Sequence, residues 1–163
     1  MPAPLLVSAK HFCDAPIHSA AVSAAFGRLY IGSRSDDERR LNLLVATLDG
    51  GRIVGRERRY RDSPLPLPPS TISAIESVIV HDELRKLFLV ASLRAASPPA
   101  EERLLTVYDL DPATGEPRGE PRAYRLPGFN FAYAVARHPV KPVVYVGARF
   151  RRSAASRSTI WIL

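Results

Sequence analysis

The chain carries one motif three times: Gly27-Arg-Leu-Tyr-Ile-Gly-Ser-Arg34, Arg85-Lys-Leu-Phe-Leu-Val-Ala-Ser92 and Pro142-Val-Val-Tyr-Val-Gly-Ala-Arg149. The aromatic residues at the centre of the motif, Tyr30, Phe88 and Tyr145, are 58 and 57 residues apart. A fixed period of this length is typical of repeat architectures, in which each repeat is one supersecondary unit. We therefore read the chain as three repeats.

Other features recur around the motif in the same order. An apolar segment follows each one: Leu43-Leu-Val-Ala-Thr-Leu-Asp49, Leu104-Leu-Thr-Val-Tyr-Asp-Leu-Asp111 and Ser158-Thr-Ile-Trp-Ile-Leu163. Gly55-Arg-Glu-Arg-Arg-Tyr-Arg61 matches Gly119-Glu-Pro-Arg-Ala-Tyr-Arg125, and His81 and His138 are again 57 residues apart. Four features in one order favour a true repeat over coincidence.

The repeats are expected to be strands. Residues 70–92 have apolar residues at roughly helical spacing, with Ser70 as an N-cap, and taken alone they would suit a helix. Pro139 and Pro142 lie in the equivalent part of the third repeat, where proline would disrupt a helix. We therefore predict an all-β fold in which each repeat forms four short antiparallel strands, with a flexible loop over residues 94–102.

Four-stranded units at this period are typical of the blades of a β-propeller. The blades are expected over about residues 20–62, 72–126 and 131–163 of a single domain, 1–163, and strand 4–8 would complete the third blade. Three blades are too few for a ring, since propellers typically have about four to eight. We therefore expect the ring to be completed by a second copy, as a six-bladed homodimer, or by another polypeptide.

The sequence resembles the β-propeller repeats of the WD-repeat, YVTN and lactonase-like groups. The resemblance rests on the His-Asp or His-Pro turn, on Leu29-Tyr-Ile-Gly32 and on Val107-Tyr-Asp-Leu-Asp-Pro-Ala-Thr-Gly-Glu116, and it covers most of the chain from about residue 22. It implies a propeller-type fold. Lactonase-like enzymes act with His, Glu and Arg near the channel, but no motif transfers those roles to positions here, so no catalytic residue is assigned.

Composition limits the class of protein. The chain has 163 residues, a net charge of +7 and 46% hydrophobic residues, which suits one globular domain. A single cysteine, Cys13, excludes a secreted disulfide scaffold, and no apolar run approaches the ~20 residues that cross a bilayer. We expect a cytoplasmic protein with no membrane contact, and nucleic acid is a possible anionic partner.

Two groups of residues are candidates for small sites. His11, Cys13, Asp14 and His18 lie within eight residues, and all four residue types bind zinc, but their spacing matches no common zinc pattern. His81 and His138 occupy equivalent turns, where a ligand site or an ordinary turn role is open. We predict no metal and no cofactor.

Arginines form the candidate partner or anion surface. They are Arg56, Arg58, Arg59 and Arg61 on an expected outer strand, and Arg149, Arg151 and Arg152, with Arg157, beside a hairpin loop. Such side chains bind phosphate, but they also protect sheet edges from aggregation. Motifs such as GxxxxGK[ST], GxGxxG, GxSxG and HExxH do not occur. The sequence therefore favours a non-catalytic propeller-type module for protein–protein interaction, with a lactonase-like hydrolase or a nucleic-acid-binding surface as alternatives.

Overall fold

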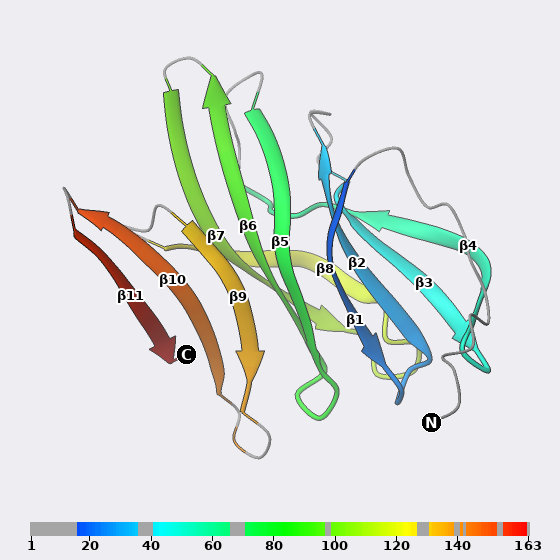
Figure 1. Ribbon diagram of the computed structural model, residues 1–163. Helices are drawn as coiled ribbons and strands as arrows, with labels where there is room; N and C mark the ends of the chain where they lie inside the picture. The colour runs from blue at the N-terminus through cyan, green and yellow to red at the C-terminus, as the bar shows by residue number, and fades with distance from the viewer. Residues whose placement is uncertain are drawn as a thin grey trace, which may run out of the picture.

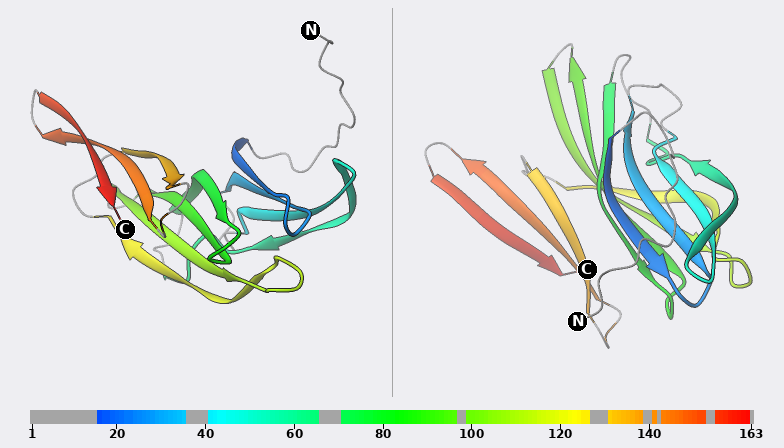
Figure 2. Two further views of the ribbon diagram at one scale, coloured as in Figure 1. Left: turned by 90° about the horizontal axis from the view of Figure 1, so that it is seen from below. Right: turned by 45° about the vertical axis from the view of Figure 1, so that its right-hand side comes forward.

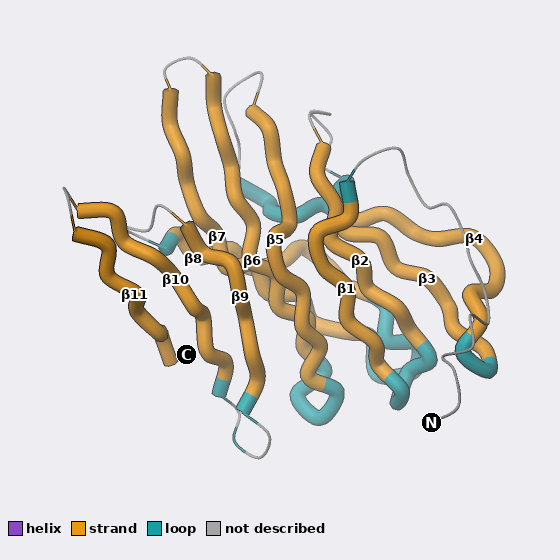
Figure 3. Tube along the Cα trace, viewed as in Figure 1, coloured by secondary structure: helices purple, strands orange, loops and turns teal. Residues whose placement is uncertain are grey.

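The computed structural model describes residues 16–35, 41–65, 71–96, 99–126, 131–138, 141, 143–152 and 155–162. Within these ranges the regular structure consists of eleven strands, all paired antiparallel, and Figure 3 shows strands and connecting loops without a helix. None of the described residues forms a helix of the length and apolarity that crossing a membrane requires. The all-β expectation is confirmed, including over residues 71–92, where helical spacing had competed.

The strands form three consecutive meanders (Figure 1). The first meander consists of β1 (Ile17–Ser23), β2 (Arg28–Ser35), β3 (Leu43–Asp49) and β4 (Arg52–Tyr60). The second consists of β5 (Thr71–His81), β6 (Lys86–Ala96), β7 (Pro99–Leu110) and β8 (Pro117–Arg125). The third consists of β9 (Phe131–Arg137), β10 (Val144–Arg152) and β11 (Ala155–Ile162).

The first two meanders share a short pairing, in which Arg34 and Ser35 of β2 continue onto Ala74 and Ser73 of β5. This pairing makes one eight-stranded sheet of β1–β8, while β9–β11 form a separate three-stranded sheet. Neither sheet closes on itself among the described residues. The expected extra strand at residues 4–8 lies outside the described ranges.

The long hairpin of β6 and β7 corrects one expectation. Residues 94–102 were expected to form a flexible loop, but strand pairing continues through Arg94↔Glu101 to Ala96↔Pro99. Pro99 is the first residue of β7, a position at which a strand tolerates the missing N–H of proline. The hairpin therefore stays paired as far as Pro99 and does not open into a long loop there.

The turn between the first and second strands has the same backbone in two meanders. Gly27 has φ +58° before β2, and Arg85 has φ +51° at the equivalent place before β6. The carbonyl of Gly27 accepts from Leu48 N, and that of Arg85 accepts from Leu110 N. A left-handed residue is required there, and glycine supplies it without the steric penalty that Arg85 carries.

Each meander has two faces, and apolar residues alternate onto both because side chains along a strand point to opposite sides. We call the face toward the next meander in sequence the forward face, and the opposite one the rear face. The forward face of the first meander packs on the rear face of the second in one core: Tyr30, Leu43, Val45, Ile75, Val78, Leu87, Leu89, Tyr108 and Leu110. A second core joins the second and third meanders: Val90, Leu105, Val107 and Val146, with Phe88, Leu126 and Val135 against it.

One hydrogen bond is repeated at both joints between meanders. Ser19 Oγ of β1 accepts from the backbone N–H of Val78 in β5, at 3.0 Å. Ser77 Oγ of β5 accepts from Val135 N in β9, at 3.2 Å. The first strands β1, β5 and β9 therefore lie in a row with a constant offset, and we call them the inner strands (Figure 1).

Candidate functional site

A β-bulge interrupts each inner strand at the equivalent residue. The pairing skips His18 in β1, Glu76 in β5 and Tyr133 in β9, which are 58 and 57 residues apart. A bulge leaves one residue outside the regular pairing and redirects its side chain. The repeat therefore places one bulge residue per meander along the row of inner strands.

The bulge residues of the first two meanders meet. His18 Nδ1 lies 3.0 Å from Glu76 Oε2, and Ser92 Oγ donates to Glu76 Oε1 at 2.5 Å. The side chains of His18 and Glu76 retain 29% and 24% of their solvent exposure. We call His18, Glu76 and Ser92 the bulge site.

The bulge site has a defined chemistry. A carboxylate only accepts hydrogen bonds, so the contact with Glu76 requires the proton on Nδ1 of His18. This arrangement orients the ring and leaves Nε2 as the nitrogen able to accept a proton or bind a ligand. Within the described part of the chain, no group of three or more His, Cys, Asp or Glu side chains is placed to hold a metal ion.

Sequence reasoning found only one member of the bulge site. It grouped His18 with His11, Cys13 and Asp14, which lie outside the described residues. Glu76 and Ser92 were missed, although a signal existed because Glu76 follows His18 by one repeat period. The bulge that turns both side chains toward each other has no marker in the sequence.

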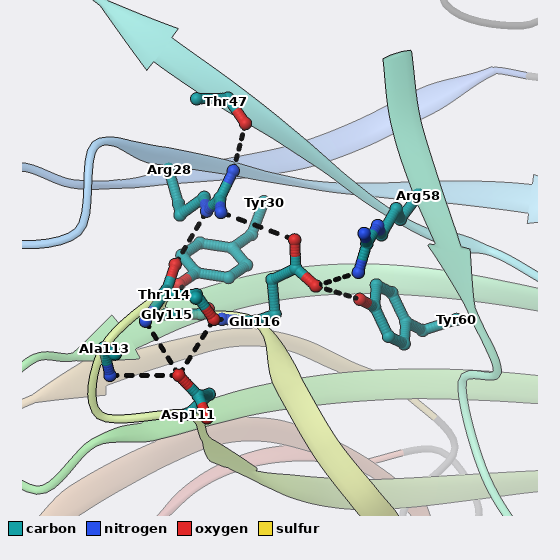
Figure 4. Close-up of polar contacts among 10 residues, drawn as sticks. All are labelled: Arg28, Tyr30, Thr47, Arg58, Tyr60, Asp111, Ala113, Thr114, Gly115 and Glu116. Atoms are coloured by element: carbon teal, nitrogen blue, oxygen red, sulfur yellow. Dashed lines mark hydrogen bonds and ion pairs between the residues drawn. The ribbon is translucent and has the colours of Figure 1, made fainter. Parts of the chain in front are cut away.

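A second polar cluster holds the first two meanders together (Figure 4). The turn between β7 and β8 reaches the forward face of the first meander, where Tyr30 Oη donates to the Gly115 carbonyl at 2.6 Å. Glu116 Oε2 accepts from Arg58 and from Tyr60 Oη, and Glu116 Oε1 lies 3.4 Å from Arg28 Nη2. Burial, followed by the nearby charge of Glu116, raises the pKa of Tyr60.

The same turn is stabilised from within by Asp111. Its Oδ1 accepts from the backbone N–H groups of Ala113 and Thr114, at 3.0 and 2.8 Å, and from the Thr114 hydroxyl. These hydrogen bonds, those of Thr114 first, lower the pKa of Asp111. The cluster therefore has a structural role, because its donors and acceptors pair with one another.

Buried polar groups form a third contact between these meanders. Asn42 Nδ2 donates to Asp62 Oδ2 at 2.8 Å and to the Ser73 carbonyl at 3.3 Å, and Ser73 Oγ also donates to Asp62. Asn42, Asp62 and Ser73 are fully buried. These paired groups fix how β5 leaves the first meander, although Asn42 Oδ1 is buried without a hydrogen-bond partner among the described residues.

His81 lies at the end of β5 and His138 directly after β9, so both are at the start of equivalent turns, as expected. His138 Nδ1 accepts from Lys141 N at 2.9 Å, as Ser23 Oγ accepts from Phe26 N at 3.1 Å in the first meander. His81 is 2% exposed at the corresponding position. Accepting from the residue three positions later is an ordinary turn role, which His138 fills. Both ring nitrogens of His81 are instead buried without a hydrogen-bond partner among the described residues.

The predicted arginine surface divides into two parts. Arg56, Arg58, Arg59 and Arg61 lie exposed on or directly after β4, the edge strand of its sheet, and Arg58 contacts Glu116. The backbone of Arg149, Arg151 and Arg152 belongs to β10, and that of Arg157 to β11. Figures 1 and 2 show β4 and β10 at opposite ends of the molecule, so the fold does not gather the two groups on one rim.

Comparison with known proteins leaves the site to be judged on its own geometry, because no protein-family model, no curated protein and no solved structure matches the chain.

Proposed function

We propose that the protein is a β-propeller-type interaction module, whose three meanders are successive blades and whose third blade binds a further blade supplied by another polypeptide chain. One observation carries the proposal. The forward face of the third meander has no described meander against it, whereas the forward faces of the first two are packed. Ala134, the register equivalent of Ser19 and Ser77, is exposed, as is Ala136.

The physical reason is the cost of leaving such a face in water. Each joint buries apolar side chains on both of its faces, and burial stabilises by about 25 cal/mol per Å². A third meander with an uncovered face forgoes this contribution on one side. Open sheet structures of this kind also expose strand edges, which favour association.

The test is site-specific photocrosslinking. A photoreactive amino acid replaces exposed Ala136 on the forward face of the third meander. In the matched control it replaces Leu84, which is 37% exposed in the β5–β6 turn. In extract of the cells that make the protein, position 136 should give a discrete adduct whose crosslinked peptide mass spectrometry identifies, and position 84 should not. Equal labelling at both positions, or none at 136, would overturn the proposal.

A second candidate, hydrolysis of a lactone or ester, is favoured by the bulge site. Its His18 ring is held by Glu76 and keeps Nε2 available, which suits a general base. The chain should then hydrolyse members of a panel of lactones and aryl esters, with a rate lost in His18→Ala. A rate that is absent, or that survives this change, removes the candidate.

A further inference from the structure

Residues on the forward face distinguish the middle meander from the outer two. The first meander presents Tyr30 and Gly32, and the third presents Tyr145 and Gly147 at the same register positions. The second meander has Phe88 and Val90 there. The third meander therefore repeats the forward face of the first.

Gly32 forms a notch that an isoleucine fills. A Cβ atom added to Gly32 would lie 2.6 Å from Cγ2 of Ile75, closer than real Cβ atoms approach. Ile75, on the rear face of β5, is fully buried. The first joint thus combines a glycine on one face with an isoleucine on the other.

At the second joint the residues at the two equivalent positions have the opposite relative sizes. Val90 occupies the notch position, and the register equivalent of Ile75 in β9 is Ala132, because Ile75 pairs with Ala91 and Ala132 pairs with Ala148. At these two register positions the sequence of the second joint therefore has valine and alanine in place of glycine and isoleucine. Close-packed interiors require this compensation, since an added or missing methylene is felt.

The chain carries a second glycine notch, at Gly147, and a second isoleucine that could fill such a notch, Ile17. Among the described residues, an added Cβ at Gly147 would come within 4 Å of Ala134 of its own sheet alone, at 3.7 Å, so no described meander fills the notch. Ile17 is the register equivalent of Ile75, because it pairs with Ser33 as Ile75 pairs with Ala91. Ile17 is 51% exposed, whereas Ile75 is buried.

We propose that the polypeptide that completes the proposed propeller-type assembly is a second copy of this chain, with Ile17 of each copy seated in the Gly147 notch of the other. The inference rests on the proposed function and names its partner. A two-fold axis makes the contact twice and closes six meanders into a ring without leaving an open end. The contact runs along β1, where Ile17, Ala20 and Val22 are exposed; farther out on the same rear face, Ile31 and Leu44 are buried.

The aromatic residue beside the notch supports the same pairing. Tyr30 Oη donates to a carbonyl in the turn between the third and fourth strands of the next meander. Tyr145 has the same hydroxyl, which Phe88 at the second joint lacks. The corresponding turn of the first meander contains Gly50, at which an added Cβ would meet no atom of the described residues within 4 Å, so none of them covers this turn. A second copy would bring this turn to Tyr145.

The test is molar mass by light scattering over a dilution series of the purified chain. The wild type should have twice the 18.0 kDa mass of one chain. Gly147→Val should fill the notch at both contacts of the dimer and weaken association by at least about tenfold, because overpacking a close-packed contact is destabilising. Combining it with Ile17→Ala should restore the dimer, because valine and alanine occupy these two register positions at the second joint.

Two further measurements distinguish a loss of association from a loss of folding. Circular dichroism and urea unfolding of Gly147→Val should match those of monomeric wild type, which excludes misfolding as the cause of lost association. A wild-type monomer at every concentration, or a dimer indifferent to both Gly147→Val and Ile17→Asp, overturns the inference. If the chain alone is monomeric and position 136 still crosslinks a different protein, the proposed function survives without the second copy; with neither signal, both fail.

Discussion

His18 and Glu76 lie 3.0 Å apart, from Nδ1 to Oε2, although 58 residues separate them in the chain. Each is the extra residue of a β-bulge in an inner strand, so the contact joins the first two meanders at equivalent positions. The pair is partly exposed, which limits its energetic contribution because solvent screens the interaction. The contact therefore adds little stability, and its main effect is to orient the His18 ring.

The contribution of this pair is measurable by a double-mutant cycle. His18→Ala, Glu76→Ala and the double variant should show a coupling energy of about 0.2–1 kcal/mol in urea unfolding at neutral pH. Glu76→Ala alone should cost more than His18→Ala, since it also leaves Ser92 Oγ without its acceptor. A coupling energy of zero would show that the contact does not form in solution.

Gly32→Ala should destabilise the fold by about 1–3 kcal/mol, because the new methyl group collides with Ile75 and Val78. Gly147→Ala is the matched control, where the nearest atom is at ordinary contact distance and the change should stay within about 0.5 kcal/mol. Both variants are compared with the wild type by urea unfolding at a dilution at which the chain is monomeric, because association shifts apparent stability. Equal costs at the two glycines would contradict the tight first joint.

Glu116→Ala should destabilise by about 1–3 kcal/mol, since it removes the acceptor for three side chains and leaves Arg28, only 14% exposed, without its carboxylate. Arg58→Ala should cost less than about 1 kcal/mol, because that side chain is 69% exposed. Thermal unfolding of the two variants side by side gives the comparison. A larger loss of stability in Arg58→Ala than in Glu116→Ala would mean that the cluster depends mainly on the exposed ion pair of Arg58 with Glu116.

Arg85→Gly should stabilise the fold by about 0.5–1 kcal/mol. The backbone at Arg85 is left-handed, with φ +51°, and glycine already occupies the equivalent position at Gly27. Arg85→Ala, which keeps the Cβ penalty, serves as the control and should change stability little. A loss of stability in the glycine variant would show that the arginine side chain outweighs its backbone strain.

The buried tyrosines predict sensitivity to alkali. Burial raises the pKa of Tyr30 above its ordinary value of 10.0, so the stability it contributes is complete below pH 10 and is lost as the pH rises toward the raised value. Tyr30→Phe should cost about 0.5–1.5 kcal/mol at neutral pH, where the hydrogen bond to Gly115 is lost. Above pH 10 its stability should fall less steeply than that of wild type.

Urea midpoints at neutral pH and above pH 10 give this comparison, with Tyr124→Phe as control because that ring is 50% exposed. If stability falls equally steeply above pH 10 in Tyr30→Phe and in wild type, Tyr30 is not the cause of the sensitivity to alkali. Burial also raises the pKa of Tyr108, so part of the slope should remain in the variant.

Local residue patterns were sufficient for much of the fold. The apolar alternation around Tyr30, Phe88 and Tyr145, together with turn residues such as Asp49-Gly50-Gly51, predicts strands and their order, because each signal acts over a few residues. The same reasoning misjudged residues 94–102, where pairing between β6 and β7 overrides the local preference of a proline-containing segment for a loop. Strand pairing is a tertiary outcome, and composition alone underestimates it.

The contacts at the joints depend on the folded structure alone. His18 reaches Glu76, and Tyr30 reaches Gly115, only because whole meanders pack face against face at a definite offset. A shift of one residue in strand register would turn every one of these side chains to the opposite face. The repeat in the sequence therefore determines three similar sheets, whereas packing between them decides which residues meet, since no local signal encodes a distance across 58 residues.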